Sequence, residues 1–213
     1  MPFIVGVVSQ KGGVGKSTIC QLVSREYAAA GWDVKIADLD TSQATCTEWK
    51  RLREQHGREP LVAVEPFGKV KQAQKHAQNY DLLIFDAPPH STTLTLDIAQ
   101  ISDLLILPTG LSLADLRPAV LLGHELVKKS IPKEKIVFTL CRVGDRENEI
   151  NEARDYIQEA GYTVLDGELP ERTGYRRAYE HGQALTESPY PGLRERAERF
   201  AKSIVNKITA IQE

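Results

Sequence analysis

The sequence has few of the residues that would stabilise it covalently or direct it into a membrane. Its cysteines number three and are widely spaced, which fits neither a disulfide framework nor a zinc site. We expect Cys20, Cys46 and Cys141 to be buried as small hydrophobic residues. No apolar run approaches the roughly 20 residues that span a bilayer, and the start of the chain lacks the pattern of a signal peptide. We therefore predict a cytoplasmic protein.

An excess of positive charge is also absent, because 27 Lys and Arg residues face 29 Asp and Glu residues. The net charge of −2 excludes a protein that is basic all over, so any binding of nucleic acid has to come from a local patch. The chain shows no internal repeat, no low-complexity tract and no linker rich in Pro, Gly or Ser. We predict a single domain over residues 1–213.

The first chemical signal is an apolar run that ends in a glycine-rich turn. Residues 3–8 predict a strand, and residues 9–18 read Ser-Gln-Lys-Gly-Gly-Val-Gly-Lys-Ser-Thr before a helical pattern. Such a turn lets successive backbone N–H groups converge on phosphate oxygens at the positive end of the helix. The predicted phosphate loop consists of Gly12, Gly13, Val14, Gly15, Lys16, Ser17 and Thr18.

Two side chains of this loop carry its chemistry. Lys16 is predicted to reach the β- and γ-phosphates of a nucleotide, and the hydroxyl of Ser17 is suited to Mg²⁺. The alternative is a glycine-rich turn that binds nothing. The order of strand, loop, Gly-Lys-Ser and helix favours the phosphate loop, because the motif requires that context.

Two later strands end in carboxylates. One ends near Asp38 and Asp40, and the other, residues 82–86, ends at Asp86 before Ala-Pro-Pro. Ligands bind at the carboxyl ends of the strands in doubly wound sheets. We predict that Asp40 orients a water or holds Mg²⁺ through one, and that Asp86 holds the Mg²⁺ shell in a Walker B pattern. The alternative is that these aspartates only cap the strand or helix ends.

Apolar strands alternate with helical patterns along the chain, which predicts right-handed, parallel β/α units. The expected fold is α/β, a three-layer P-loop NTPase fold with a mostly parallel central sheet flanked by helices. Strands are predicted near residues 3–8, 34–40, 61–64, 82–86, 103–108, 135–142 and 162–165. Helices are predicted near residues 16–30, 43–55, 69–79, 118–130, 147–160, 175–183 and 192–211, and residues 113–117 are predicted to lie in a loop.

One departure from the generic phosphate loop points to a family. Gln10 takes the place of the first glycine, and Lys11 follows it. The string of residues 11–18 resembles the deviant Walker A motif of the ParA/MinD family of dimeric ATPases, and Asp40 and Asp86-Ala-Pro-Pro match other motifs of that family. The resemblance implies that ATP or ADP binds with Mg²⁺. It also implies that Lys11 crosses a two-fold axis to the nucleotide of the partner subunit; otherwise Lys11 is a solvated loop lysine.

The resemblance extends to the base end of the nucleotide. In small ParA-like proteins an Asn or Arg at the end of the corresponding strand lies near the base, so Arg142 is either an adenine contact or a surface ion-pair partner. Residues 168–172, with Pro170, are expected to turn toward the base. The sequence departs from the family after Asp40, where Thr-Ser-Gln replaces the usual Pro-Gln. Gln43 therefore corresponds to the family's glutamine, displaced by one residue.

The resemblance covers nearly the whole chain and is strongest to the small ParA proteins that partition plasmids. It implies an ATPase of weak intrinsic turnover that dimerises on ATP, binds DNA without sequence preference and is reset by hydrolysis. A ParB-type centromere-binding partner would stimulate that hydrolysis, and the protein would associate with the bacterial nucleoid and not stably with a membrane.

Three alternatives stay open. A MinD-like regulator would need an amphipathic anchor, and the apolar stripe of residues 192–211 is that of a helix packed on its own sheet. ParA-like factors that position other cargo share all of these motifs. A metabolic P-loop enzyme of the dethiobiotin-synthetase kind would need a second substrate pocket, to which no residues point.

A candidate DNA patch lies late in the chain. Arg196, Arg199 and Lys207 fall within about a quadrant of one another on the closing helix. They are predicted to point outward together and to bind phosphates. The alternative is a solvated face in which Glu195 and Glu198 balance the arginines.

Overall fold

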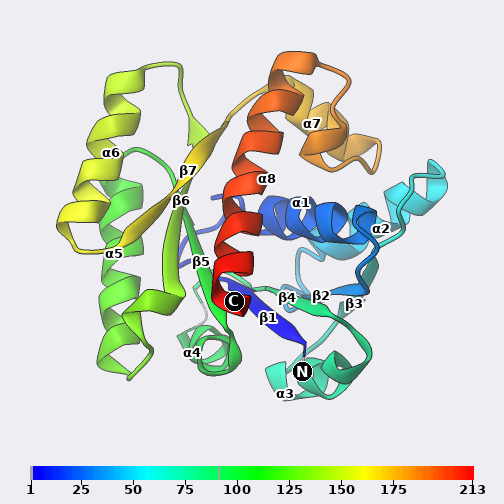
Figure 1. Cartoon of the computed structure of the whole chain (residues 1–213), viewed down its shortest axis with the longest axis horizontal. Helices are drawn as coiled ribbons and strands as arrows, with labels where there is room; N and C mark the ends of the chain where they lie inside the picture. The colour runs from blue at the N-terminus through cyan, green and yellow to red at the C-terminus, as the bar shows by residue number, and fades with distance from the viewer. Residues whose placement is uncertain (1, 91) are drawn as a thin grey trace.

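The strand order of the sheet places the glycine-rich loop at its centre. The computed structural model describes residues 2–90 and 92–213, and within these ranges seven strands form one sheet in the order β3-β2-β4-β1-β5-β6-β7 (Figure 1). All described pairs are parallel. The strands are β1 (Phe3–Val7), β2 (Val34–Asp38), β3 (Ala63–Pro66), β4 (Leu82–Asp86), β5 (Leu104–Thr109), β6 (Ile136–Val143) and β7 (Thr163–Pro170).

Helices connect the strands and cover both faces of the sheet (Figure 1). They are α1 (Lys16–Ala29), α2 (Thr45–Gln55), α3 (Val70–His76), α4 (Thr92–Ile101), α5 (Leu113–Lys128), α6 (Glu147–Glu159), α7 (Thr173–Glu180) and α8 (Pro191–Gln212). Three short 3₁₀ turns, η1 (Ala77–Asn79), η2 (Lys133–Lys135) and η3 (Leu185–Glu187), complete the described elements.

Alternation along the strands creates two hydrophobic cores. In β4, Leu82 and Ile84 face one core, whereas Leu83 and Phe85 face the other. The first core is closed by α1, α2, α7 and α8, which contribute residues such as Ile19, Trp49, Tyr175 and Phe200. The second is closed by α3, α4, α5 and α6, with residues such as Val70, Ile98, Leu116 and Ile157. The predicted three-layer P-loop fold is confirmed.

The structure differs from the sequence prediction at several elements. The segment with Pro170 was expected to turn, but β7 continues through Pro170. The β3 strand starts at Ala63 rather than at Leu61, which is 56% exposed. Residues 113–117 were expected in a loop, but α5 begins at Leu113, because the carbonyl of Ser112 at the N-cap already accepts from the N–H groups of Asp115 and Leu116. A helix at α4 was not predicted, because its first residues, Thr-Thr-Leu-Thr, have weak helix propensity. Tertiary packing stabilises α4, since a Cβ at Gly6 of β1 would lie 2.4 Å from the side chain of Ile98.

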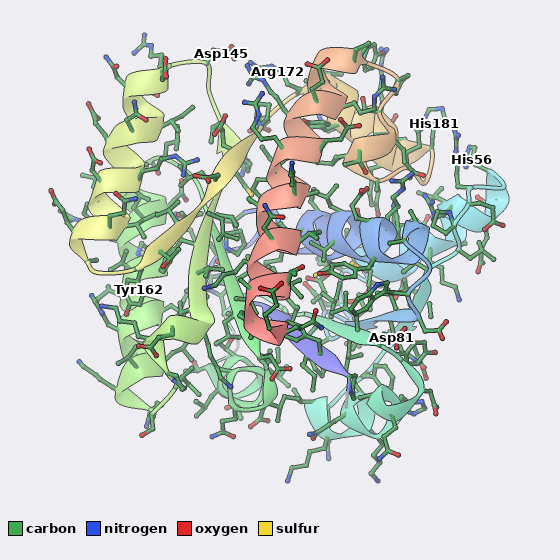
Figure 2. The ribbon with its side chains drawn as sticks, viewed as in Figure 1. His56, Asp81, Asp145, Tyr162, Arg172 and His181 are labelled. Atoms are coloured by element: carbon green, nitrogen blue, oxygen red, sulfur yellow. The ribbon has the colours of Figure 1, made fainter. Side chains whose placement is uncertain are left out.

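The C-terminal ends of α2 and α7 are joined tightly. Arg53 is buried, donates to the carbonyl of Gly182 over 3.0 Å and pairs with Glu187 at 2.6 Å. His56 and His181 meet at the outer edge of this joint, with ring centroids 5.4 Å apart (Figure 2). The joint fixes α7 beside α2, which begins close to the carboxyl end of β2.

Further expectations concern the cysteines and the membrane. All three cysteines are free and buried, as predicted. Among the residues that the structure describes, no helix combines the length and the apolar character needed to cross a membrane.

Candidate functional site

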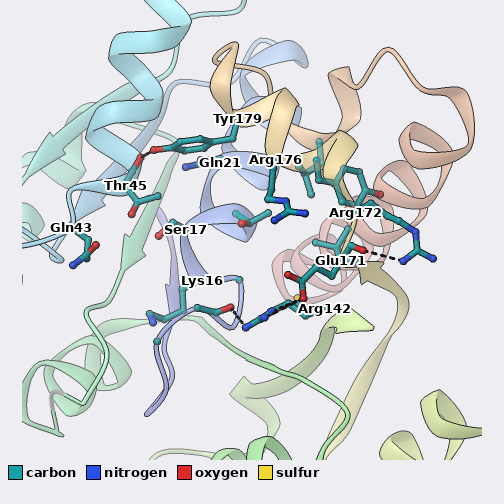
Figure 3. Close-up of a pocket in the computed structure, with 18 of the residues that line it drawn as sticks. Lys16, Ser17, Gln21, Gln43, Thr45, Arg142, Glu171, Arg172, Arg176 and Tyr179 are labelled. Carbon is teal, nitrogen blue, oxygen red and sulfur yellow. Dashed lines mark hydrogen bonds and ion pairs between the residues drawn. The ribbon is translucent and has the colours of Figure 1, made fainter. Parts of the chain in front are cut away.

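A cavity of about 630 Å³ opens at the carboxyl ends of the strands (Figure 3). It lies between the phosphate loop after β1, the loops that follow β2 and β4, the carboxyl end of β6 and the segment that leads from β7 into α7. Its lining residues are Gly12, Gly13, Gly15, Lys16, Ser17, Thr18, Gln21, Asp40, Gln43, Thr45, Pro89, Cys141, Arg142, Leu169, Pro170, Glu171, Arg172, Tyr175, Arg176, Tyr179, Gln183 and Leu185.

The phosphate loop has the backbone that its glycines predict. Gly13 and Gly15 have φ values of 70° and 104°, in the left-handed region that favours glycine. A Cβ at Gly15 would also lie 3.2 Å from the sulfur of Cys141. The α1 helix begins at Lys16, so its free N–H groups and its positive end face the cavity. Val14 is buried and does not line the cavity.

Lys16 is held over its own loop. Its side chain is buried, and Nζ donates a 3.1 Å hydrogen bond to the carbonyl oxygen of Lys11. Burial lowers the pKa of Lys16, although Asp86 and Asp40 act in the opposite direction. The ammonium therefore lies among the groups predicted to bind phosphate and metal.

Lys11 does not line the cavity of its own chain. Its Nζ lies 2.7 Å from Oδ1 of Asp115, on the first turn of α5. The hydroxyl of Ser112 donates to Oδ2 of the same carboxylate over 2.6 Å. Partial burial acts to raise the pKa of Asp115, but the contacts with Lys11 and Ser112 outweigh it and hold the pKa below its ordinary value. Lys11 is therefore a surface ion-pair partner within its own chain, and its contact with a second nucleotide stays a prediction.

Asp86 fits the role of a metal-shell ligand. Its side chain is 1% exposed, and burial raises its pKa to about 6. Oδ2 accepts a 3.2 Å hydrogen bond from the thiol of Cys46. Oδ1 is buried and accepts none from any residue that the structure describes. An unpartnered carboxylate oxygen at a strand end, in the same site as the Ser17 hydroxyl, is the donor set that Mg²⁺ and its waters use.

Asp38 and Asp40 have different roles. Asp38 is fully buried and accepts from the backbone N–H and the hydroxyl of Thr47, at 3.0 and 2.9 Å, so it caps α2. Asp40 lines the cavity and accepts from the Ser42 hydroxyl over 2.7 Å and from the backbone N–H of Gln43 over 3.2 Å. The capping alternative therefore holds for Asp38, whereas Asp40 caps the turn that follows it and also lines the cavity, where its role toward water or Mg²⁺ stays a prediction. Gln43 is exposed at the cavity rim.

The two residues predicted to lie near the base both line the cavity, and one of them also contacts the phosphate loop. Pro170 lines it at the end of β7. Arg142, in a left-handed conformation with φ of 58°, lines it too, pairs with Glu171 at 3.1 Å and donates to the carbonyl of Gly13 over 3.3 Å (Figure 3). The ion-pair alternative for Arg142 is therefore present in the structure, and the adenine contact stays a prediction.

Helix α7 contributes residues to the cavity that were not predicted from the sequence. Tyr175, Arg176 and Tyr179 line the cavity, and Arg176 extends over it from above (Figure 3). The Tyr179 hydroxyl donates to the carbonyl of Thr45 over 3.3 Å, which ties α7 to the start of α2. Tyr175 and Tyr179 are four residues apart, so they share one helix face, which is the signal that could have placed this helix at the site.

The candidate DNA residues lie on α8, outside the cavity lining. Arg199 is exposed, whereas Arg196 and Lys207 are half-buried beside the apolar stripe. The stripe itself packs as predicted through Ala197, Phe200, Ile204 and Ile208, but Ile211 is 38% exposed near the end of the helix. The three basic side chains therefore do not share a fully exposed face of α8.

Comparisons with known proteins agree with this geometry. Residues 5–185 match the CobQ/CobB/MinD/ParA nucleotide-binding domain family. Over 98% of both chains the protein is 26% identical to Protein ParA of Rhizobium radiobacter. It is also 26% identical to the maintenance of carboxysome distribution protein A of Gloeobacter kilaueensis, over 86% of this chain and 84% of that protein.

A solved structure extends the likeness to the whole fold. The septum site-determining protein MinD of Pyrococcus horikoshii, in complex with Mg-ADP, superposes with a TM-score of 0.76 at 19% identity. The superposition covers 100% of this chain and 99% of that one.

Proposed function

Because the chain belongs to the CobQ/CobB/MinD/ParA nucleotide-binding family, we propose that it is a Mg²⁺-dependent ATPase of the ParA type that partitions DNA. It dimerises on ATP, binds DNA without sequence preference and returns to the monomer after hydrolysis. A ParB-type partner that binds the centromere of a plasmid stimulates that hydrolysis. The likeness to Protein ParA over nearly the full length of both chains supports this choice.

The observation that carries the proposal is the position of Lys11. The residues needed to bind the phosphates of one nucleotide line the cavity without it. Lys11 adjoins that loop but points outward, 2.7 Å from Asp115. A lysine in this position can reach a second nucleotide across a two-fold axis, where it stabilises the charge that develops during phosphoryl transfer.

The residues of the site divide the chemistry among them. Backbone N–H groups of the loop and the Lys16 ammonium hold the phosphates, and Ser17 and Asp86 hold Mg²⁺. When bound, Mg²⁺ neutralises charge between the β- and γ-phosphates. Asp40 orients the attacking water, and the Lys11 of the partner neutralises the transition state. Arg142, Pro170 and α7 enclose the base end.

A second candidate function is the positioning of another cargo, and one relative favours it. The carboxysome-distribution protein is as similar in sequence as Protein ParA, although over less of the chain. Both functions use the same nucleotide cycle and differ in the partner protein. A MinD-like role rests on fold likeness alone, since the MinD structure is 19% identical.

The test is retention of random-sequence duplex DNA on the protein with ATP, with ADP and without nucleotide. We expect strong retention with ATP only, and hydrolysis that rises when a small DNA-binding protein encoded by a neighbouring gene is added. Equal DNA retention with ATP, with ADP and without nucleotide would contradict ATP-dependent DNA binding. Recruitment to anionic vesicles with ATP, and no DNA retention, would favour the membrane-associated alternative.

A further inference from the structure

The ammonium of Lys11 is already engaged within its own subunit. Its carboxylate partner, Asp115, lies 104 residues later in the chain, on the first turn of α5, and the two atoms are 2.7 Å apart. Asp115 is fixed from its other side, because Ser112 donates to Oδ2 over 2.6 Å and the backbone N–H of Asp115 donates to the Ser112 carbonyl over 2.8 Å.

The backbone of Lys11 is held as well. Its N–H donates to the hydroxyl of Ser9 over 3.1 Å, and its carbonyl accepts from Nζ of Lys16 over 3.1 Å. The side chains of Lys11 and Asp115 are 36% and 29% exposed, so the ion pair lies at the surface beside the cavity mouth. A charged pair in this position can separate without opening the core.

We propose that Asp115 is a positioning residue for Lys11, which it holds in its own subunit until the polyphosphate of a partner's nucleotide replaces the carboxylate. The inference rests on the proposed function and adds a residue that controls it. Formation of a two-fold dimer breaks the Lys11–Asp115 contact twice, once in each subunit. The contact therefore opposes dimerisation until the new acceptor is stronger.

The exchange explains how one lysine discriminates between nucleotides. The carboxylate of Asp115 offers one negative charge, whereas ATP offers the partner's Lys11 the charge of the γ-phosphate in addition to that of the β-phosphate. ADP lacks this additional charge. With Asp115 in place, ATP is expected to outcompete the carboxylate and ADP is not.

The direct test is Asp115→Asn. The amide keeps the shape of the side chain and can still accept from Ser112, but it removes the charge that faces Lys11. Exposed ion pairs stabilise proteins weakly, so two broken pairs correspond to a dimer dissociation constant with ATP that is about 2- to 30-fold lower than in the wild type. Sedimentation over a concentration series measures it, and the variant should also show dimer with ADP.

Two further variants separate this role from a general effect of charge. Glu125→Gln removes one negative charge from an exposed position on the same helix and should leave the dissociation constant unchanged. Asp115→Asn in a Lys11→Ala background should give no gain in dimer over Lys11→Ala alone. An unchanged or higher dissociation constant in Asp115→Asn, or a gain that persists without Lys11, would overturn the proposal.

The contact can also be measured in the monomer. Without nucleotide, a cycle of Lys11→Ala, Asp115→Asn and the double variant should show coupling of about 1–4 °C in Tm. If the cycle shows no coupling while the wild type still dimerises with ATP, the role of Asp115 is overturned and the proposed function stays intact. A wild type that stays monomeric with ATP overturns the proposed function, and the exchange with it, whatever the coupling.

Discussion

Oδ2 of Asp86 accepts a 3.2 Å hydrogen bond from the thiol of Cys46, while Oδ1 of the same carboxylate is buried and has no partner among the described residues. This arrangement leaves one oxygen available to the proposed Mg²⁺ and its waters. It also places a carboxylate where its charge is costly without Mg²⁺. The properties of Asp86 in the free protein should therefore differ from those of a surface aspartate.

Asp86→Asn should stabilise the nucleotide-free protein while it abolishes Mg²⁺-dependent hydrolysis. Burial raises the pKa of Asp86 from 3.8 to about 6, so the buried charge destabilises the fold at pH values above about 6, and this cost disappears below about 4. The gain in the Asn variant should reach at most about 3 kcal/mol at about pH 8 and vanish near pH 4. Urea unfolding at both pH values measures it, and an equal difference at both would contradict the buried charge.

Lys16→Ala should weaken ATP binding about 100-fold, because the ammonium supplies charge-assisted hydrogen bonds that the backbone N–H groups do not replace. Titration with a fluorescent ATP analogue measures the affinity. The control is Lys128→Ala, which removes an exposed lysine at the end of α5. Equal affinity in Lys16→Ala and in the wild type would refute the phosphate loop.

Asp38 and Asp40 should separate stability from catalysis. Asp40→Ala is expected to lower hydrolysis about 10²- to 10⁴-fold and to trap the ATP-bound dimer, because this carboxylate orients the water. Asp38→Ala should instead lower the stability by about 1–2 kcal/mol, because it removes the cap of α2. Turnover measured at saturating ATP and urea unfolding distinguish the two. Loss of turnover in Asp38→Ala with normal stability would reverse the assignment.

The basic residues of α8 can be tested by salt dependence. If Arg196, Arg199 and Lys207 contact phosphates, their triple alanine variant should weaken binding uniformly across DNA sequences and flatten the slope of log affinity against log salt by about 0.9 per contact. Hydrolysis without DNA should stay near the wild-type rate. The control triple variant replaces three exposed lysines along α3, on the other face of the sheet, namely Lys69, Lys71 and Lys75. Equal slopes in both variants would place the DNA site elsewhere.

The sequence predicted the parts of the site that depend on local backbone chemistry. Gly13 and Gly15 are needed because their φ values are positive. Lys16 is the first residue of α1, and Asp86 is the last residue of the apolar strand β4. Each of these features depends on a short segment of sequence. The phosphate loop, the Walker B strand and the three layers could therefore be predicted from the order of the residues. The cap formed by Asp38 was one of two open alternatives, and only the contacts with Thr47 decided between them.

Features that depend on long-range packing could not be predicted in this way. Arg176 reaches the cavity because Arg53, Gly182 and Glu187 join α7 to α2, more than 100 residues apart in the sequence. The contact between Lys11 and Asp115 likewise exists only because the loops after β1 and β5 are neighbours in the sheet. The sequence around Lys11 does not indicate Asp115, and the sequence around Asp115 does not indicate Lys11.

If Lys11 acts on the nucleotide of the other subunit, mixing two inactive variants should restore activity, and this is the most direct test. In a heterodimer of Lys11→Ala with Asp40→Ala, one site keeps its own Asp40 and receives Lys11 from the partner, whereas the other site lacks both. Variants mixed before ATP is added should therefore regain about a quarter of the wild-type rate, if random pairing gives half heterodimers with one working site each. Hydrolysis by the mixture no greater than the sum of the two separate variants would contradict the account.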